Sequence, residues 1–248
     1  MCRTLASCLV LGLLLGAAPT TKPGTRPASK PADDLFTMSD DAFAKQPRVN
    51  APIDFANVDH EVLSAVVLRE TNKQRVANKL AKLLHLPKLD DAAKLHAVAM
   101  NRDKFFAHEN PNDASLREPI DRVKRVGLDP KLVAENLATQ FGIRYESGKP
   151  AFVLDNGMVS DQPNGRPIPP HTYASFGKVL VEQWMNSPPH RHDILLPDAK
   201  YMGSWCERAT APTDEQKQKQ ENEQDADDPA FHKFYCVQVF FTPMREKR

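Results

Sequence analysis

The sequence has almost no excess of charge of either sign. Its 33 Lys and Arg residues stand against 32 Asp and Glu residues, which gives a formal net charge of +1. Such a balance argues against a surface devoted to nucleic-acid binding. Glycine is also scarce, with 10 residues against 21 prolines, and this ratio favours ordered or extended connectors over flexible linkers. No segment repeats internally.

Several motifs that mark common enzyme classes are missing. The HExxH zinc motif does not occur, because the Glu109 that follows His108 has no second histidine at helical distance after it. The GxSxG turn of α/β-hydrolases is absent, and so are the GxGxxG and phosphate-loop patterns. These absences exclude the sites that those motifs build.

The first residues have the layout of a secretory signal. Arg3 precedes an apolar run at 9–15, and the small residues Gly16, Ala17 and Ala18 follow. The run is too short to span a membrane. The tetrapeptide LASC resembles a lipidation box, but the apolar run follows it instead of preceding it. We therefore expect a signal peptide at 1–18 and a secreted, periplasmic or otherwise extracytoplasmic protein, which does not span a membrane once the signal is cleaved.

Only four cysteines are present, and two of them, Cys2 and Cys8, fall in the expected signal. Cys206 and Cys236 remain in the mature chain. An even pair in an oxidising compartment predicts a disulfide, and two buried free thiols are the alternative.

Helical periodicity begins after a stretch of mixed composition. Residues 19–57 are rich in Pro, Lys and Asp without sustained periodicity, so we expect a loosely ordered arm before one domain at 58–244. Three helices follow. Asp59 and Asp90 are expected to cap the first two, and the third is expected to have a capping box of Ser115 and Glu118 and to end at Gly127.

The second half alternates irregular segments with regular ones. Residues 143–171 carry several turn signals and are interpreted as an insertion, after which helical spacing resumes at 173–187. Two short aromatic strands are predicted at 201–206 and 234–241. The charged segment 207–233 between them is expected to be a mobile acidic loop. Helices followed by helix, strand, loop and strand favour an α+β fold over a doubly wound parallel sheet.

Three titratable residues lie beside apolar residues at the expected ends of elements: His108 in FFAHENP, Glu135 in VAENLA and His190 in SPPHRHDIL. Two imidazoles and a carboxylate suffice to bind Zn²⁺ with one position open. The same three groups can instead form a hydrogen-bonded polar cluster. Glu135 also has a structural interpretation, as a partner of Arg191, and His96 is expected to be a core histidine.

These pieces, in this order, resemble the CAP (SCP-like) superfamily of secreted proteins, and its bacterial branch in particular. The resemblance covers about 59–142 and 173–242. It rests on ETNKQR, LHLPKL, AVAMNRDKFFAH, IDRVKRVG, AENLA, WMNSPPHRHDIL and YCVQVF. It implies a three-layer α-β-α sandwich with a mainly antiparallel central sheet and a central cleft.

The resemblance also implies roles for individual residues. His108, Glu135 and His190 match the cleft residues of the family. Ala134 and Pro189 depart from its usual glycines, and Ser187 stands where eukaryotic members have a second glutamate, for which Glu182 is a candidate substitute.

The function implied is binding rather than catalysis. The expected ligands of a cleft with His108, Glu135, His190 and Ser187 are a lipid or other small apolar molecule, a divalent cation such as zinc on His108 and His190, or an extracytoplasmic protein or cell wall. The alternative is a metal-assisted, peptidase-like hydrolase with Glu135 as ligand or general base.

Overall fold

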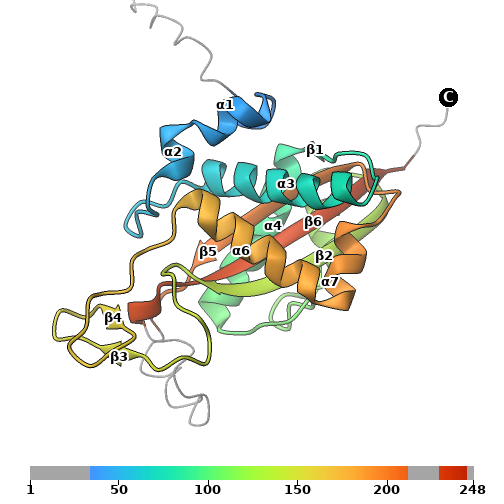
Figure 1. Cartoon of the computed structure of the whole chain (residues 1–248). Helices are drawn as coiled ribbons and strands as arrows, with labels where there is room; N and C mark the ends of the chain where they lie inside the picture. The colour runs from blue at the N-terminus through green and yellow to red at the C-terminus, as the bar shows by residue number, and fades with distance from the viewer. Residues whose placement is uncertain (1–33, 212–228, 245–248) are drawn as a thin grey trace, which may run out of the picture. The chain divides into compact units, whose positions relative to one another are not determined.

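A four-stranded sheet forms the centre of the domain, and helices cover both of its faces (Figure 1). The computed structural model describes residues 34–211 and 229–244. The strand order is β1-β5-β6-β2, with bounds Leu84–His85, Tyr201–Arg208, Lys233–Pro243 and Pro130–Phe141. The short β1 pairs parallel with β5, and the other pairs are antiparallel. The predicted α+β sandwich with a mainly antiparallel sheet is confirmed.

The helices divide into two layers. One face carries α3 (His60–Ala77), α6 (Tyr173–Asn186) and α7 (Pro188–Ile194), and α4 (Pro87–Asp103) and α5 (Pro119–Arg125) lie on the other. Smaller elements complete the described chain: α1 (Asp40–Ala44), α2 (Pro47–Asn50), β3 (Phe152–Val153), β4 (Val159–Ser160) and the 3₁₀ turns Ala114–Leu116 and Pro229–Phe231.

The strand β6 is buried on both faces and separates two cores. Successive side chains of a strand point to opposite faces. Accordingly Phe234, Cys236 and Phe240 pack with the α3 and α6 core, whereas Tyr235 and Val237 pack with the α4 core. Trp184 of α6, which is 0% exposed, donates its indole N–H to the Leu137 carbonyl at 3.0 Å.

Local signals set most helix ends. Asp59 caps α3, where its carboxylate accepts the Val62 N–H at 3.2 Å, and Gly127 adopts φ +76° after α5, as predicted. The predicted box of Ser115 and Glu118 is wrong. The box consists of Glu118 and Asp121, because Pro119 occupies the first helical position and starts the helix later.

Asp90 is not a cap, because α4 already begins at Pro87. Its carboxylate instead accepts the Ser64 hydroxyl of α3 and the Ser204 backbone N–H of β5, each at 2.8 Å, and contacts His85 Nε2 at 2.6 Å. Gly203 allows this approach, since a Cβ there would lie 2.5 Å from the Asp90 nitrogen. The Asp90 carboxylate, which belongs to the layer of α4, is thus bonded both to the layer of α3 and to the sheet.

The structure differs from expectation in the segment 34–57. This part of the predicted loose arm forms α1 and α2 and buries four apolar side chains in the α3 and α6 core: Leu35, Phe43, Val49 and Ile53. Only Phe43 and Val49 lie in the two short helices, and Leu35 and Ile53 lie in the irregular segments around them, so no periodicity reveals the four. The expected signal at 1–18, the arm up to residue 33 and the loop segment 212–228 lie outside the described residues. No helix of the described part is long and apolar enough to cross a membrane.

The insertion at 143–171 connects β2 to α6 and contains the β3–β4 hairpin. It packs through a small apolar cluster of Ile143, Val159 and Phe231. Its last residue, His171, is 6% exposed and donates its backbone N–H to the Gly142 carbonyl at 2.8 Å. The ring of His171 lies 2.9 Å from the Ser175 hydroxyl.

We expect His171 to make the domain sensitive to acid. Burial, followed by the charge of Arg144, lowers the pKa of His171 from 6.5 to about 4. The unfolded chain takes up a proton near pH 6.5 that the folded chain refuses until about pH 4. The contribution of His171 to the free energy of unfolding is therefore fully present above pH 6.5 and is lost as the pH drops towards 4. The loss is about 2 kcal/mol after allowance for partial solvent screening. Urea unfolding of wild type and His171→Asn at pH 7 and 4.5 checks this.

The difference in free energy of unfolding between the two pH values should shrink in His171→Asn. His192→Asn is the matched control, because the His192 side chain is 72% exposed. An equal pH dependence in wild type and His171→Asn would contradict the role of His171.

Candidate functional site

The site is arranged around two consecutive residues of β2, Glu135 and Asn136, whose side chains leave the strand on opposite faces. Glu135 points to the layer of α5, where it meets His108. Asn136 points to the layer of α7, where its amide donates to the His190 carbonyl at 3.1 Å. The two histidines are thus attached to opposite faces of one strand.

A buried ion pair forms the base of the site. Arg122 of α5 and Glu135 are 1% and 5% exposed, and the guanidinium Nη2 lies 3.0 and 2.8 Å from the two carboxylate oxygens. A buried charge is costly unless it is paired and hydrogen-bonded, and this pair meets that condition. The Glu135 carboxylate has one further partner, the His108 Nδ1 at 3.0 Å.

Arg122 also holds the chain around His108 in place. Its guanidinium donates to three backbone carbonyls, those of Leu116, Arg117 and His108, at 2.8–3.0 Å. One arginine therefore fixes both the carboxylate and the backbone of the histidine that the carboxylate contacts.

His108 is oriented but accessible. A carboxylate paired with a guanidinium accepts hydrogen bonds, so His108 presents Nδ1–H to Glu135 and leaves Nε2 free for a ligand. This hydrogen bond to Glu135 raises the pKa of His108 above its usual 6.5, with burial opposing the effect. The His108 side chain is 52% exposed.

His190 lies near the start of α7, which begins at Pro188 after the break at Ser187. Burial lowers the pKa of His190, and the neighbouring charge of His108 lowers it further. His190 is therefore neutral near pH 7. The structure brings His108 and Glu135 into contact, and it places the backbone of His190 beside Asn136, the next residue of β2.

His96 supports the site from the core, as expected of a core histidine. It is 0% exposed, and its Nε2 lies 2.8 Å from the carbonyl of Ala107, the residue before His108. Burial lowers the pKa of His96, so the ring is neutral. Neutral His96 donates from Nε2 and anchors the backbone next to His108.

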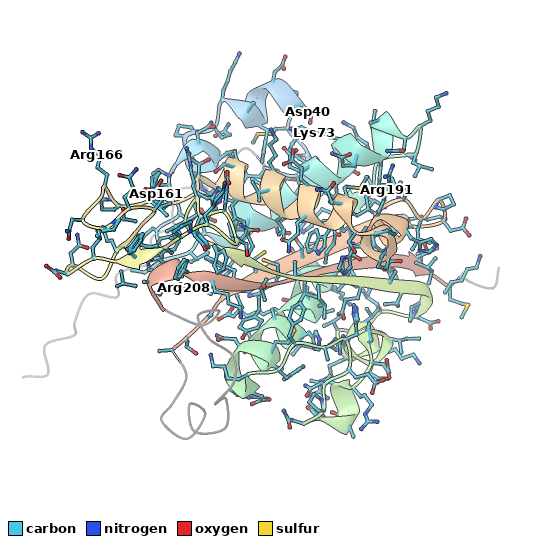
Figure 2. The ribbon with its side chains drawn as sticks, turned by 60° about the horizontal axis from the view of Figure 1, so that its bottom comes forward. Asp40, Lys73, Asp161, Arg166, Arg191 and Arg208 are labelled. Carbon is cyan, nitrogen blue, oxygen red and sulfur yellow. The ribbon has the colours of Figure 1, made fainter. Side chains whose placement is uncertain are left out.

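The structure also places Arg191, Glu182 and Ser187, the three other residues that the sequence suggested for the site. Glu135 pairs with Arg122 and not with Arg191, which is exposed on α7 (Figure 2). Glu182 does not replace a second glutamate of the site, because it is exposed and lies 3.9 Å from Lys178 of its own helix. Ser187 sits at the junction of α6 and α7, where its backbone N–H donates to the Trp184 carbonyl.

Sequence reasoning missed Arg122. It lies in a short helix beside Lys124 and Arg125, both exposed, and nothing in the charge pattern separates it from them. The one available signal is indirect, because a buried glutamate requires a buried cation.

The donor set does not fit a tightly held zinc ion. Zinc sites in proteins use three or four protein ligands. Here two imidazoles are available, and both oxygens of Glu135 are bound to Arg122. Among residues 34–211 and 229–244, no group of three His, Cys, Asp or Glu side chains is placed to hold a metal ion.

A separate apolar groove of about 1120 Å³ lies between the segment 34–40, α3 and β1. Leu68, Val76, Leu84 and Tyr201 are among its lining residues. Val76 and Leu84 are 51% and 60% exposed, so the groove offers apolar surface to a ligand.

The family model described as "CAP: Cysteine-rich secretory protein family" matches residues 68–240. No curated protein matches the chain by sequence.

Three similar solved structures are bacterial. An extracellular protein containing a SCP domain from Bacillus anthracis is 20% identical with a TM-score of 0.46, over 73% of this chain and 41% of that one. An outer surface protein from Borrelia burgdorferi is 15% identical with a TM-score of 0.47, over 79% and 99%. A cysteine-rich secretory protein from Staphylococcus aureus is 12% identical with a TM-score of 0.41, over 74% and 40%.

The chain thus matches less than half the length of the Bacillus and Staphylococcus proteins. The family match spans more than half of the present chain. It includes Glu135 and His190 and all four strands of the main sheet except the last residues of β6. The chain belongs to the CAP, or cysteine-rich secretory protein, family.

Proposed function

We propose that this protein is a non-catalytic, extracytoplasmic binding domain that recognises a protein partner through His108 and His190. The observation that supports this most directly is that the Glu135 carboxylate bonds to two side chains. The carboxylate bonds both Arg122 and His108 and orients His108 through Nδ1, which leaves Nε2 of this half-exposed ring available as a hydrogen-bonding group. The neutral His190 supplies a second such group.

The same observation disfavours a hydrolase. A general base must accept a proton from water within hydrogen-bonding distance. Glu135 is 5% exposed, and both of its oxygens already accept hydrogen bonds from the Arg122 guanidinium. Within the part of the chain that the structure describes, no three His, Cys, Asp or Glu side chains are placed to hold the metal that a metal-assisted hydrolase requires.

The apolar groove favours a second candidate, the binding of a small apolar molecule. That ligand would lie between α3, β1 and the segment 34–40, away from His108 and His190. A fluorescent fatty acid distinguishes the two candidates, because Val76→Asp would weaken its binding and His108→Ala would not.

Binding of an unfolded polypeptide tests the leading proposal. Reduced and carboxymethylated α-lactalbumin, a soluble unfolded chain, serves as the probe for biolayer interferometry at pH 7.5. We expect wild type to bind it and His108→Ala and His190→Ala each to bind about tenfold more weakly, since each loses about one hydrogen bond. Mass spectrometry of the probe should show no cleavage.

His192→Ala is the control, because His192 is on the same helix but is exposed and bonded to Asp193. Cleavage of the probe by wild type but not by His108→Ala would establish the hydrolase instead. An absence of binding, or binding equal in all variants, would overturn the proposal.

A further inference from the structure

The strand β2 has one paired edge and one unpaired edge. Among the strands of the described residues, it is the last in the sheet and pairs only with β6. The bond from Gly142 N–H to the His232 carbonyl, 2.9 Å long, shows which residues of β2 bond towards β6. Antiparallel bonded pairs recur every second residue, so even-numbered residues of β2 are bonded to β6 and odd-numbered ones turn their N–H and C=O outward.

The outward groups nearest to the histidines belong to Val133 and Glu135. Within the described residues no backbone hydrogen bond reaches the N–H or C=O of either one outside the sheet. Farther along, the outward carbonyl of Leu137 is occupied by the Trp184 indole, and beyond the end of β2 the segment 169–171 bonds to Gly142 and Arg144. The stretch of the edge next to the site, at Val133 and Glu135, is therefore unbonded.

The histidines flank this free edge. His108 is bonded to the Glu135 side chain on one face of β2, and His190 is bonded through its carbonyl to Asn136 on the other. A row of alternating unpaired donors and acceptors lies between them. The backbone of another extended chain is complementary to this row, because its C=O groups can accept from the unpaired N–H groups and its N–H groups can donate to the unpaired C=O groups.

The edge is also recessed, which selects between a peptide and a second copy of the domain. Glu135 is only 5% exposed although none of the described residues bonds to its outward N–H or C=O. Figure 2 shows β2 at the margin of the sheet between the helices of the two layers. A single extended chain can enter there, whereas another sheet edge would bring its own helical layers into collision.

We propose that the free edge of β2 at Val133 and Glu135 binds an extended peptide segment of the partner as an added strand, with His108 and His190 on either side of it. The inference rests on the proposed function and specifies the conformation in which the partner is recognised. Backbone bonds to Val133 and Glu135 supply affinity, and the two imidazoles contact side chains or carbonyls of the added strand.

Val133→Pro tests the edge directly. Proline removes the outward N–H of Val133 but no bond of the sheet, so the edge strand tolerates it. With reduced and carboxymethylated α-lactalbumin as the probe, Val133→Pro should weaken binding about tenfold or more, because a donor is lost and the ring obstructs the added strand. Val133→Ala, which keeps the N–H, is the matched control and should bind within about twofold of wild type.

A second measurement needs no substitution. Hydrogen exchange of the full-length wild-type protein should show the amides of Val133 and Glu135 becoming protected when the probe binds. The even-numbered neighbours, already bonded in the sheet, should not change. This readout holds even if Val133→Pro fails to fold.

The outcomes separate the inference from the function on which it rests. Binding that requires His108 and His190 but leaves Val133→Pro unaffected and both amides unprotected would overturn the added strand alone. Loss of the histidine dependence would overturn both. Protection of both amides without the probe, accompanied by a dimer in sedimentation that Val133→Pro dissociates, would show that a second copy occupies the edge and would refute the peptide.

Discussion

Replacing Arg122 by leucine will destabilise the domain by about 3–5 kcal/mol, the usual cost of breaking a buried ion pair from one side. The substitution leaves Glu135 buried without its cation and releases the carbonyls of Leu116, Arg117 and His108. Urea unfolding followed by circular dichroism at pH 7 measures the loss.

Two variants make this expectation specific. Arg125→Leu alters an exposed arginine of the same helix and should change stability by no more than about 0.5 kcal/mol. The double variant Arg122→Leu/Glu135→Leu removes both charges and should recover much of the loss, because no uncompensated charge remains. If Arg122→Leu lowers the free energy of unfolding no more than Arg125→Leu does, the ion pair does not stabilise the site.

The second large effect concerns Cys206 and Cys236. They are directly opposite on β5 and β6, and both are buried free thiols in the structure. The bond from Ala209 N–H to the Lys233 carbonyl fixes the register. Hydrogen-bonded pairs recur every second residue from Ala209 and Lys233, so Cys206 and Cys236 form a non-hydrogen-bonded pair. Pairs of this kind lie closer together, with Cα atoms about 4.5 Å apart. That separation lies within the range of a disulfide.

We therefore expect oxidising conditions to join Cys206 and Cys236 in a disulfide and to raise the free energy of unfolding by about 3–4 kcal/mol. The bond closes a loop of about 30 residues in the unfolded chain, counted as 236 minus 206. Urea unfolding with and without dithiothreitol measures the gain, and the intact mass should fall by about 2 Da, the two hydrogens lost.

In Cys206→Ala/Cys236→Ala, dithiothreitol should have no effect on unfolding. Two thiols titrating in denatured, exported protein would refute the disulfide and leave the buried thiols as the native form. Burial raises the pKa of the Cys236 thiol, which slows its oxidation in the folded state, so the bond is expected to form before folding is complete.

The sequence was sufficient for features that depend on neighbouring residues. Asp59 and Gly127 act at helix ends through their own backbone neighbourhoods, and pattern reading located both. Pattern reading failed where a side chain bonds to residues that are distant in the sequence. Asp90 resembles a cap, yet its carboxylate finds partners on α3 and β5, which no local pattern encodes.

The candidate site shows the same division. The motifs around His108, Glu135 and His190 were recognisable, and the fold joins His108 to Glu135 and the His190 backbone to the neighbouring Asn136. The electrostatic partner of Glu135 was not recognisable, because Arg122 and Arg191 are equally plausible from the sequence and only the packing of α5 against β2 chooses between them. The burial of Leu35 and Phe43 was missed for a related reason, since isolated apolar residues gain meaning only from the surface that they cover.

Asp90 has a consequence for how the domain comes apart. Its one carboxylate spans from α4 to α3 and to the backbone of β5, so it joins the two helical layers that the sheet otherwise separates. Detachment of the α3 layer breaks the bond from Ser64, and detachment of α4 breaks the bonds from both Ser64 and Ser204, which adds a penalty to states in which one layer has opened. Subglobal opening of a single layer is thereby suppressed, and the two cores behave as one cooperative unit.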